Sequence, residues 1–321
     1  MISAFCLYNK VLIIDCGLAI NQKDNRVWRG LMKIAVIGAE GIIGRVLVEY
    51  LCQQGYSVRG YDLFPKSINT YDHINYEYIC INEENICYNG VDGIVLLAAK
   101  RPITAFSLDD YYQNVKIVYE NVLKAVSDNV RRIVFASSIS VYSEYSLPYR
   151  EIDYSIPLNL YGASKLAGEQ IGNLLTQKTN SSFIALRFAH VIGVNEKKGF
   201  LIRTVLDNAL NKRKQIVYGD GAQRRHYVYV KDVCRAIEAA LLAKNHSGVF
   251  NIGMKNIYSN LELAEYANKV FHNNGNILHD FSKPMIGKDD EMSIDKARLE
   301  LDFVPKYDLE ESFLDLAESK K

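Results

Sequence analysis

The chain has 321 residues, of which 49% are hydrophobic and 23% are charged, and its formal net charge is +1. This composition is typical of a globular protein with one large domain or two smaller ones. The near-zero charge gives no electrostatic case for nucleic-acid binding, and no apolar run approaches the length of a membrane span. The six cysteines form no Cys-x-x-Cys or Cys/His cluster, so we expect reduced thiols in a cytoplasmic protein, with neither a disulfide framework nor a metal site.

The first 31 residues differ from the rest of the chain. The apolar residues 11–14 are similar to the core of a signal peptide, but the polar residues on both sides, Lys10 and Asp15, cut this stretch short. The first strand of the fold is expected directly after Met32. We therefore expect residues 1–31 to be an appendage outside the fold, from a start that is over-extended.

A strand, a glycine turn and a helix follow one another from residue 33. Residues 33–37 are mostly apolar and partly β-branched, which predicts a buried parallel strand. Gly38, Gly41 and Gly44 come next, and a helical pattern then continues to about Gly55. Such a turn lets the backbone approach a pyrophosphate and directs helix N–H groups at it. The alternative is a glycine-rich turn that binds no ligand.

Asp62 ends the second predicted strand, which covers residues 57–61. It follows the glycine turn by about 20 residues, where an acid hydrogen-bonds the ribose of a dinucleotide. A carboxylate there repels a 2′-phosphate, which favours NAD over NADP, although Arg59 and Lys66 are close in sequence. The alternative is an ordinary carboxylate in a turn after a strand.

Further strands and helices alternate along the chain. In the predicted helix 108–128 the apolar side is marked by Tyr112, Val115, Val118, Val122 and Ala125. The alternation predicts an α/β fold with a Rossmann-type, doubly wound parallel sheet, in which ligands lie beyond the carboxyl ends of the strands. The remaining predicted elements are strands at 93–99, 132–138 and 182–187 and a helix at 158–177.

Tyr161 and Lys165 are four residues apart on the helix 158–177 and therefore share one face. Ionising a phenol of pKa about 10 near neutral pH requires about 4 kcal/mol. A lysine charge about 4.5 Å away supplies about 3.7 kcal/mol at an effective dielectric constant of about 20. The pair could thus deprotonate an alcohol, although a half-buried tyrosine beside a solvated lysine produces the same pattern.

The ordered motifs resemble the extended short-chain dehydrogenase/reductase family. Within it, the chain is most similar to NAD-dependent epimerase/dehydratases that act on nucleotide sugars, of the UDP-glucose 4-epimerase type. The resemblance covers residue 32 to about residue 315. It is carried by the glycine turn, Leu97-Ala98-Ala99, Ser137-Ser138-x-x-Val141-Tyr142, Tyr161-x-x-x-Lys165, Leu186-Arg187-Phe188, Gly219-Asp220-Gly221 with Arg225, Tyr229-Val230-Lys231-Asp232 and Asn251-Ile252-Gly253.

The resemblance implies roles for individual residues. Ser138 would hydrogen-bond the reacting sugar oxygen, Tyr161 would be the base and later the acid, and Lys165 would lower the pKa of Tyr161 and hold the nicotinamide ribose. His190 and Arg225 would join Ser138 in binding substrate. NAD would contact Gly38, Gly41, Ile42, Ile43, Gly44, Asp62, Leu63, Leu97, Ala98, Ala99, Asn114, Ala136, Ser137, Tyr161, Lys165 and Phe188. Ser138 could instead only cap its strand, and Asn114 could only bond backbone.

The resemblance also implies a domain division and an assembly. Residues 32–187, with return segments at about 226–256, would form the NAD-binding domain. Residues 188–225 and 257–321 would mainly form a smaller C-terminal α/β domain that binds substrate. The helices 108–128 and 158–177 correspond to those that pair two subunits in the family, so a homodimer is expected.

Two positions after Ser138 discriminate among relatives. Sugar 4,6-dehydratases of the family carry an Asp-Glu pair there, and related decarboxylases carry Glu at the first position. Ile139 and Ser140 cannot transfer protons as carboxylates do. Dehydration and decarboxylation are therefore disfavoured, and epimerisation or simple dehydrogenation remains.

Departures from the family pattern limit what can be said of the substrate. His190 stands where Asn is usual, and it could contact substrate or fill space below the cleft. Arg225 matches the arginine that grips a diphosphate, a task for which the guanidinium fork is suited. His226 replaces the acid that commonly follows, and only Lys288 might substitute for a second arginine.

Three hypotheses therefore remain. The first is an NAD-dependent epimerase of a nucleotide sugar, which passes through a keto intermediate. The second is an NAD-dependent dehydrogenase or reductase of a polyol or sugar alcohol. The third is a non-catalytic NAD-binding regulatory protein, against which the complete set of Ser138, Tyr161 and Lys165 argues.

Overall fold

A computed structural model describes residues 32–63, 71–81, 86–102, 105–143, 147–193, 196, 198–243, 246–275, 277–282 and 288–319. The predicted appendage at 1–31 and the cation Lys66 lie outside the described residues.

Seven strands form one parallel sheet in the order β10-β6-β5-β4-β1-β2-β3. The order reverses between β1 and β4, because the chain winds outward from β1 in both directions. The prediction of a doubly wound Rossmann-type sheet is thereby confirmed. The strands are β1 (Lys33–Ile37), β2 (Ser57–Asp62), β3 (Tyr76–Cys80), β4 (Gly93–Leu96), β5 (Arg132–Ser138), β6 (Ser182–Phe188) and β10 (Gly248–Ile252).

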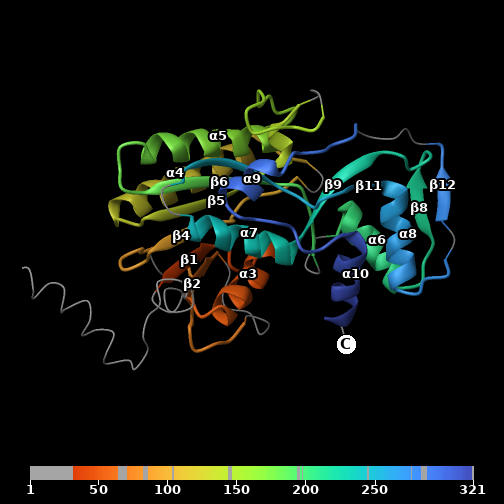
Figure 1. Cartoon of the computed structure of the whole chain (residues 1–321), viewed down its shortest axis with the longest axis horizontal. Coiled ribbons are helices and arrows are strands. Elements are labelled where there is room, and N and C mark those ends of the chain that lie inside the picture. Colours follow the sequence, from red (N-terminus) through yellow and green to blue (C-terminus); the bar gives the residue numbers. More distant parts are fainter. Residues whose placement is uncertain are drawn as a thin grey trace, which may run out of the picture.

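Helices cover both faces of this sheet (Figure 1). α3 (Ile42–Gln53) and α7 (Val230–Leu242) pack on one face, where Leu47 and Ile237 join Val36 and Val134 in one buried cluster. α4 (Leu108–Ser127) and α5 (Leu160–Thr176) lie on the other face (Figure 1). Because both faces are covered, the central strands β1 and β4 are apolar at nearly every position rather than at alternate ones.

The C-terminal half adds two small sheets and a second core beside the large sheet (Figure 1). One sheet has the order β11-β9-β7 and the other pairs β12 with β8. Besides α7 and β10, the C-terminal half contains β7 (His190–Ile192), α6 (Leu201–Leu210), β8 (Gln215–Tyr218), β9 (Arg224–Tyr229), β11 (Ile257–Ser259), α8 (Asn260–Val270), β12 (Ile277–Asp280) and α10 (Leu309–Glu318). α9 (Asp295–Glu300) contacts β10 of the large sheet. The division into two domains at the residues named above stays a prediction.

Two predictions from the sequence differ from the structure. The strand expected at 93–99 ends at Leu96, because the N–H groups of Leu97 and Ala98 both donate to the Ile37 carbonyl, which closes the ladder. Tyr112 is 60% exposed and does not belong to the buried side of α4. Repeated steps of three residues drift around a helix of 3.6 residues per turn, so Tyr112 and Val118 point in different directions.

The ends of α4 and α5 are set by their caps. The Ser107 side chain accepts the N–H of Asp110, whose carboxylate accepts the N–H of Ser107 in return. The Asn159 side chain accepts the N–H of Gly162, so α5 begins at Leu160. These are the ordinary ways in which the first orphan N–H groups of a helix are satisfied.

None of the helices in the described ranges combines the length and the apolar character that a bilayer crossing requires. Cys52, Cys80 and Cys234 are buried free thiols, and Cys87 is an exposed one. The cytoplasmic location expected from the cysteines stays a prediction.

Candidate active site

The glycine turn lies at the carboxyl end of β1, against the segment that follows β4. Gly38 has φ +92°, and a Cβ there would lie 2.8 Å from the backbone nitrogen of Ala98. A Cβ on Gly44 would lie 2.1 Å from the Gly38 carbonyl oxygen. Both positions therefore require glycine. Helix α3 then starts at Ile42 with no side-chain cap and no acid in its first turn, which leaves its first N–H groups open to an anion. These features fit a dinucleotide pyrophosphate.

Asp62 ends β2 at the same edge of the sheet, beside this turn. Its two carboxylate oxygens accept the backbone N–H groups of Glu40, at 2.9 Å, and Leu63, at 2.8 Å. The carboxylate is therefore held in one position, as recognition of a ribose hydroxyl requires. Leu63 itself is 53% exposed.

Asn114 lies on α4 and connects two other parts of the predicted site. Its amide exchanges hydrogen bonds with the backbone of Lys100, at 2.8 and 3.1 Å, and donates to the hydroxyl of Ser164 on α5, at 3.3 Å. It is 3% exposed. Asn114 thus bonds backbone and holds the segment after Ala98 and Ala99 in place, and its part in supporting the cofactor site stays a prediction.

Ser138, Tyr161 and Lys165 come together at the carboxyl end of β5. The Ser138 side chain is close enough to lower the pKa of Tyr161, and Ser138 Oγ lies 3.2 Å from Ser140 Oγ. The Lys165 ammonium donates to the Ala136 carbonyl at 2.7 Å and lies 5.7 Å from the centre of the Tyr161 ring. Ser138 pairs in register with Phe188 of β6, so the aromatic ring expected beside the nicotinamide adjoins the same point.

Ser137 differs from its neighbour Ser138. Its hydroxyl donates to a carboxylate oxygen of Glu169 at 2.5 Å, and it is 4% exposed. Side chains alternate across a strand, so Ser137 faces the helix while Ser138 faces the site. Any contact of Ser137 with a cofactor would have to be made by its backbone.

The pKa values of the central pair depend mostly on burial. Burial raises the pKa of Tyr161, while the Arg101 charge and the Ser138 side chain partly offset this effect. Burial, with a smaller effect of Arg101, lowers the pKa of Lys165 to about 7. The Lys165 ammonium is directed at the Ala136 carbonyl, and the role of Lys165 in lowering the pKa of Tyr161 stays a prediction.

Arg101 and Glu196 were missed from the sequence. The Arg101 guanidinium bonds both oxygens of the buried Glu196 carboxylate, at 2.8 and 3.1 Å, and stacks 4.2 Å from the centre of the Phe200 ring. Its place just after the end of a parallel strand could have pointed to Arg101. Glu196 is 95 residues away in sequence, and no local signal identifies it as the partner.

His190 and Arg225, the predicted substrate residues, lie together on β7 and β9. His190 Nε2 lies 2.9 Å from Asp290 Oδ2, and Arg225 Nη1 lies 3.9 Å from the same oxygen. Burial opposes ionisation of Asp290, but His190 and the N–H of His226 hold its pKa below the ordinary value. Asp290 was not predicted as a site residue, and it contacts both His190, expected to contact substrate, and Arg225, expected to bind a diphosphate.

His226, which stands where relatives carry an acid, joins two distant segments. Its Nδ1 accepts the N–H of Met292 at 3.0 Å, and its Nε2 donates to the Met254 carbonyl at 2.7 Å. Burial lowers the pKa of His226, in agreement with a neutral ring that has one donor and one acceptor. The imidazole therefore fixes the segment that carries Asp290.

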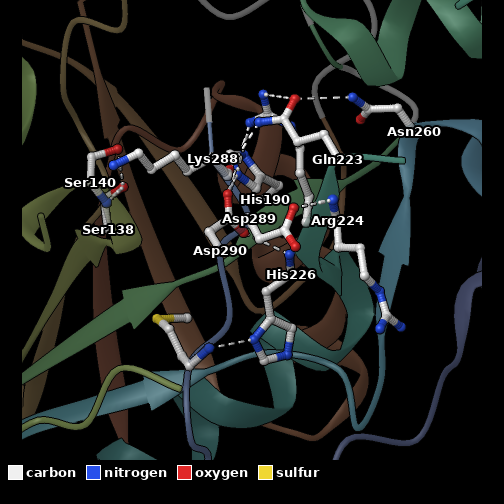
Figure 2. A network of polar contacts seen from close by, with 12 residues as sticks. Ser138, Ser140, His190, Gln223, Arg224, His226, Asn260, Lys288, Asp289 and Asp290 are labelled. Atoms are coloured by element: carbon white, nitrogen blue, oxygen red, sulfur yellow. Dashed lines mark hydrogen bonds and ion pairs between the residues drawn. The ribbon is translucent and has the colours of Figure 1, made fainter. Parts of the chain in front are cut away.

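Lys288 belongs to that same segment. Its carbonyl accepts a hydrogen bond from Gln223 Nε2 at 2.9 Å. In the view of Figure 2 its side chain is directed toward Ser138 and Ser140, and its role as a second diphosphate-binding cation stays a prediction. Ser140 also donates its backbone N–H to Ser138 Oγ at 3.1 Å.

The doubly wound sheet and the glycine turn at its carboxyl edge define an enzyme of the Rossmann-fold class. Residues 34–253 match the NAD dependent epimerase/dehydratase family. The chain belongs to this family of enzymes, and NAD is its cofactor.

Individual relatives support the same placement. The chain is 30% identical to a UDP-glucose 4-epimerase of Lacticaseibacillus casei, over 74% of this chain and 81% of the relative. The structure of a UDP-N-acetylglucosamine 4-epimerase from Bacillus cereus is 29% identical and covers 90% of this chain and 99% of its own, with a TM-score of 0.79. A structure of MoeE5 with UDP-glucuronic acid and NAD is 25% identical and covers 90% of this chain and 100% of its own, also with a TM-score of 0.79.

Proposed function

We propose that the protein is an NAD-dependent epimerase that inverts one carbon of the sugar in a nucleotide sugar. The observation that carries this proposal is the convergence of Ser138, Tyr161 and Lys165 at the carboxyl end of β5, opposite His190 and Arg225. The relatives named above act on UDP-glucose and UDP-N-acetylglucosamine, which supports a nucleotide sugar as the substrate class.

In the proposed reaction Tyr161 acts as base and then as acid. Its phenolate removes the proton of a secondary alcohol, while Ser138 donates a hydrogen bond to the reacting oxygen. NAD supplies a hydride acceptor, and later a hydride donor, for the carbon that carries this oxygen. The ketone turns so that its other face receives the hydride, and Tyr161 returns the proton to the oxygen. The configuration of the carbon is thereby inverted with no net redox change.

Positive charge must favour the phenolate, because burial raises the pKa of Tyr161. Arg101 supplies part of this charge, and its bidentate bond to Glu196 holds it in place. We propose that Lys165 contributes when its ammonium turns from the Ala136 carbonyl toward the nicotinamide ribose. That movement would bring a second cation beside Tyr161.

The residues that would hold NAD lie along one edge of the sheet. The glycine turn and the first turn of α3 would hold the pyrophosphate through Gly38, Gly41, Ile42, Ile43 and Gly44. Asp62 would bind the adenosine ribose, beside Leu63. The nicotinamide half would lie against Leu97, Ala98, Ala99, Ala136, Ser137 and Phe188, with Asn114 supporting Lys165 through Ser164.

Ile139 and Ser140 narrow the chemistry. Removal of water from the sugar needs additional carboxylates that transfer protons, and neither side chain at these positions can do so. The keto intermediate is therefore expected to be reduced again rather than dehydrated.

The proposal is tested by Tyr161→Phe. Turnover should fall by at least about 100-fold, because general acid–base catalysis contributes roughly 100- to 10,000-fold. NMR of UDP-glucose, UDP-N-acetylglucosamine and UDP-glucuronate incubated with the enzyme and NAD would report epimerisation. Tyr154→Phe is the matched control, since Tyr154 is 82% exposed and should not affect turnover. Near-normal turnover in Tyr161→Phe, with NAD still bound, would refute the role of Tyr161.

A second candidate is an NAD-dependent dehydrogenase of a polyol or sugar alcohol. Asp290 favours it, because this carboxylate already offsets part of the charge on Arg225 and contacts His190. Net NADH formation with a polyol, and no interconversion of nucleotide sugars, would select this candidate. Retained NAD and interconversion without net NADH would select the epimerase.

We further propose a homodimer formed through α4 and α5. Leu108, Tyr112, Tyr119 and Leu123 are between 45% and 60% exposed. They fall within about 60° of one another around α4 at 3.6 residues per turn. Such an apolar stripe opposite the buried side of a helix is typical of a surface that a second subunit covers.

A further inference from the structure

The ribose end of the proposed NAD site carries two carboxylates, of which Asp62 is only one. Glu40 lies in the glycine turn, and its backbone N–H donates to Asp62 Oδ2 at 2.9 Å, so the two residues are neighbours. The Glu40 side chain is 8% exposed. Burial raises the pKa of Tyr78 on β3, and Asp62 and Glu40 raise it further, which agrees with both carboxyl groups lying near this tyrosine.

Arg45, in the first turn of α3, is bound to Glu40 at two points. Its Nη2 lies 2.9 Å from Glu40 Oε2, and its Nε donates to the Glu40 carbonyl at 3.2 Å. An arginine near the end of the second strand is the group that accommodates a 2′-phosphate in enzymes that use NADP. Here the guanidinium already has a carboxylate as its counter-charge.

Arg59, the other cation near this edge, points away from it. Its Nε lies 2.6 Å from Glu77 Oε2, and its Nη1 donates to the Cys87 carbonyl at 3.3 Å. Asp62 lies three positions after Arg59, so their side chains lie on opposite faces of β2. Within residues 32–63 the one remaining cation is Lys33, at the opposite end of β1.

We propose that Glu40 is a second determinant of selectivity for NAD over NADP, because it neutralises Arg45 and adds a negative charge beside the ribose 2′ position. Asp62 recognises the 2′-hydroxyl, and Glu40 withholds from a 2′-phosphate the arginine that would otherwise bind it. This inference rests on the proposed placement of the adenosine ribose at Asp62.

The experiment measures binding rather than turnover. Wild-type protein and variants are titrated calorimetrically with NAD+ and with NADP+, and the ratio of the two dissociation constants is compared. Glu40→Gln keeps the shape of the side chain and removes its charge. It should shift the ratio toward NADP by at least about 10-fold, equivalent to about 1.4 kcal/mol. Glu40→Ala is a second variant that should shift the ratio in the same direction.

The double variant Glu40→Gln/Arg45→Met identifies the cause. If Arg45 is the cation that Glu40 withholds, most of the shift toward NADP should disappear. Arg59→Met is the matched control and should leave the ratio unchanged. An unchanged ratio in both Glu40 variants would overturn the inference, and a shift that persists undiminished without Arg45 would overturn the part that Arg45 has in it.

These outcomes are separable from a failure of the proposed function. A protein that epimerises no nucleotide sugar but binds NAD still reports the role of Glu40. Asp62→Asn tests the placement itself. If that variant also leaves the ratio unchanged, the ribose does not lie at Asp62, and the inference falls together with that placement.

Discussion

The buried ion pair between Glu169 and Arg187 lies directly behind the candidate site and allows a quantitative prediction. Arg187 donates to both carboxylate oxygens of Glu169, at 2.9 and 2.7 Å, and the two side chains are 4% and 2% exposed. Glu169 also accepts the hydroxyl of Ser137. Glu169 follows Lys165 by one helical turn, so the pair connects α5 to β5 and β6 beneath Ser138.

Glu169→Gln should destabilise the fold by about 3 kcal/mol. The amide fills the same space but leaves a buried guanidinium without its counter-charge, and breaking a buried pair costs about 3–5 kcal/mol. Burial lowers the pKa of Arg187, but Glu169 more than offsets this and keeps that pKa above its ordinary value. Arg187 is therefore a cation, and leaving this cation buried without a counter-charge is costly. The Tyr142 ring, 4.7 Å from the guanidinium, remains and places the loss at the lower end of the range.

Urea unfolding followed by circular dichroism measures the loss as a lower midpoint with an unchanged slope. Arg187→Met alone should lose a similar amount, because it leaves a buried carboxylate unpaired. The double variant Glu169→Gln/Arg187→Met removes both charges and should lose less than the sum of the single variants by at least about 2 kcal/mol. Additive losses, or a loss below about 1 kcal/mol in Glu169→Gln, would refute the reasoning.

Two further predictions concern pH and assembly. The pKa of Lys165 falls from 10.5 to about 7 on folding, so the unfolded chain binds more protons in between, and the free energy of unfolding should rise with pH from about 7 to about 10. In Lys165→Met the urea midpoint should not show this rise between about pH 7 and pH 10. If the midpoints of the wild-type protein and of the variant changed in parallel with pH, the prediction would be wrong. Tyr119→Glu places a charge in the exposed stripe of α4 and should convert a dimer to a monomer in light scattering. Tyr154→Glu should not, and a dimer that survives Tyr119→Glu would place the interface elsewhere.

Local patterns identified much of the fold. Residues 33–37 and 132–138 were predicted as strands with the bounds that the structure has, because a strand buried on both faces is a continuous apolar run between polar turns. The glycine turn was equally readable, since positive φ and close approach leave glycine as the residue that fits. Bounds were less predictable where tertiary hydrogen bonds end an element, as the Ile37 carbonyl does at β4.

The partners of the site residues were not readable from local patterns. Asp290 and Glu196 approach His190 and Arg101 from about 100 residues away, and only the tertiary packing of the chain brings them there. The sequence identified His226 only as a departure from the family pattern. That its ring accepts the N–H of Met292 depends on a contact between segments far apart in the chain.

The sequence by itself determined that Tyr161 and Lys165 share a helix face, that glycines line a turn beside them, and that carboxylates needed for dehydration are missing after Ser138. These properties depend on helical period, backbone sterics and side-chain chemistry, which are local. Only the tertiary structure decided that the Lys165 ammonium bonds the Ala136 carbonyl and that Glu40 pairs with Arg45. It also decided that Asp290 contacts both His190 and Arg225. Long charged side chains have several partners within reach, and the packing of distant segments selects among them.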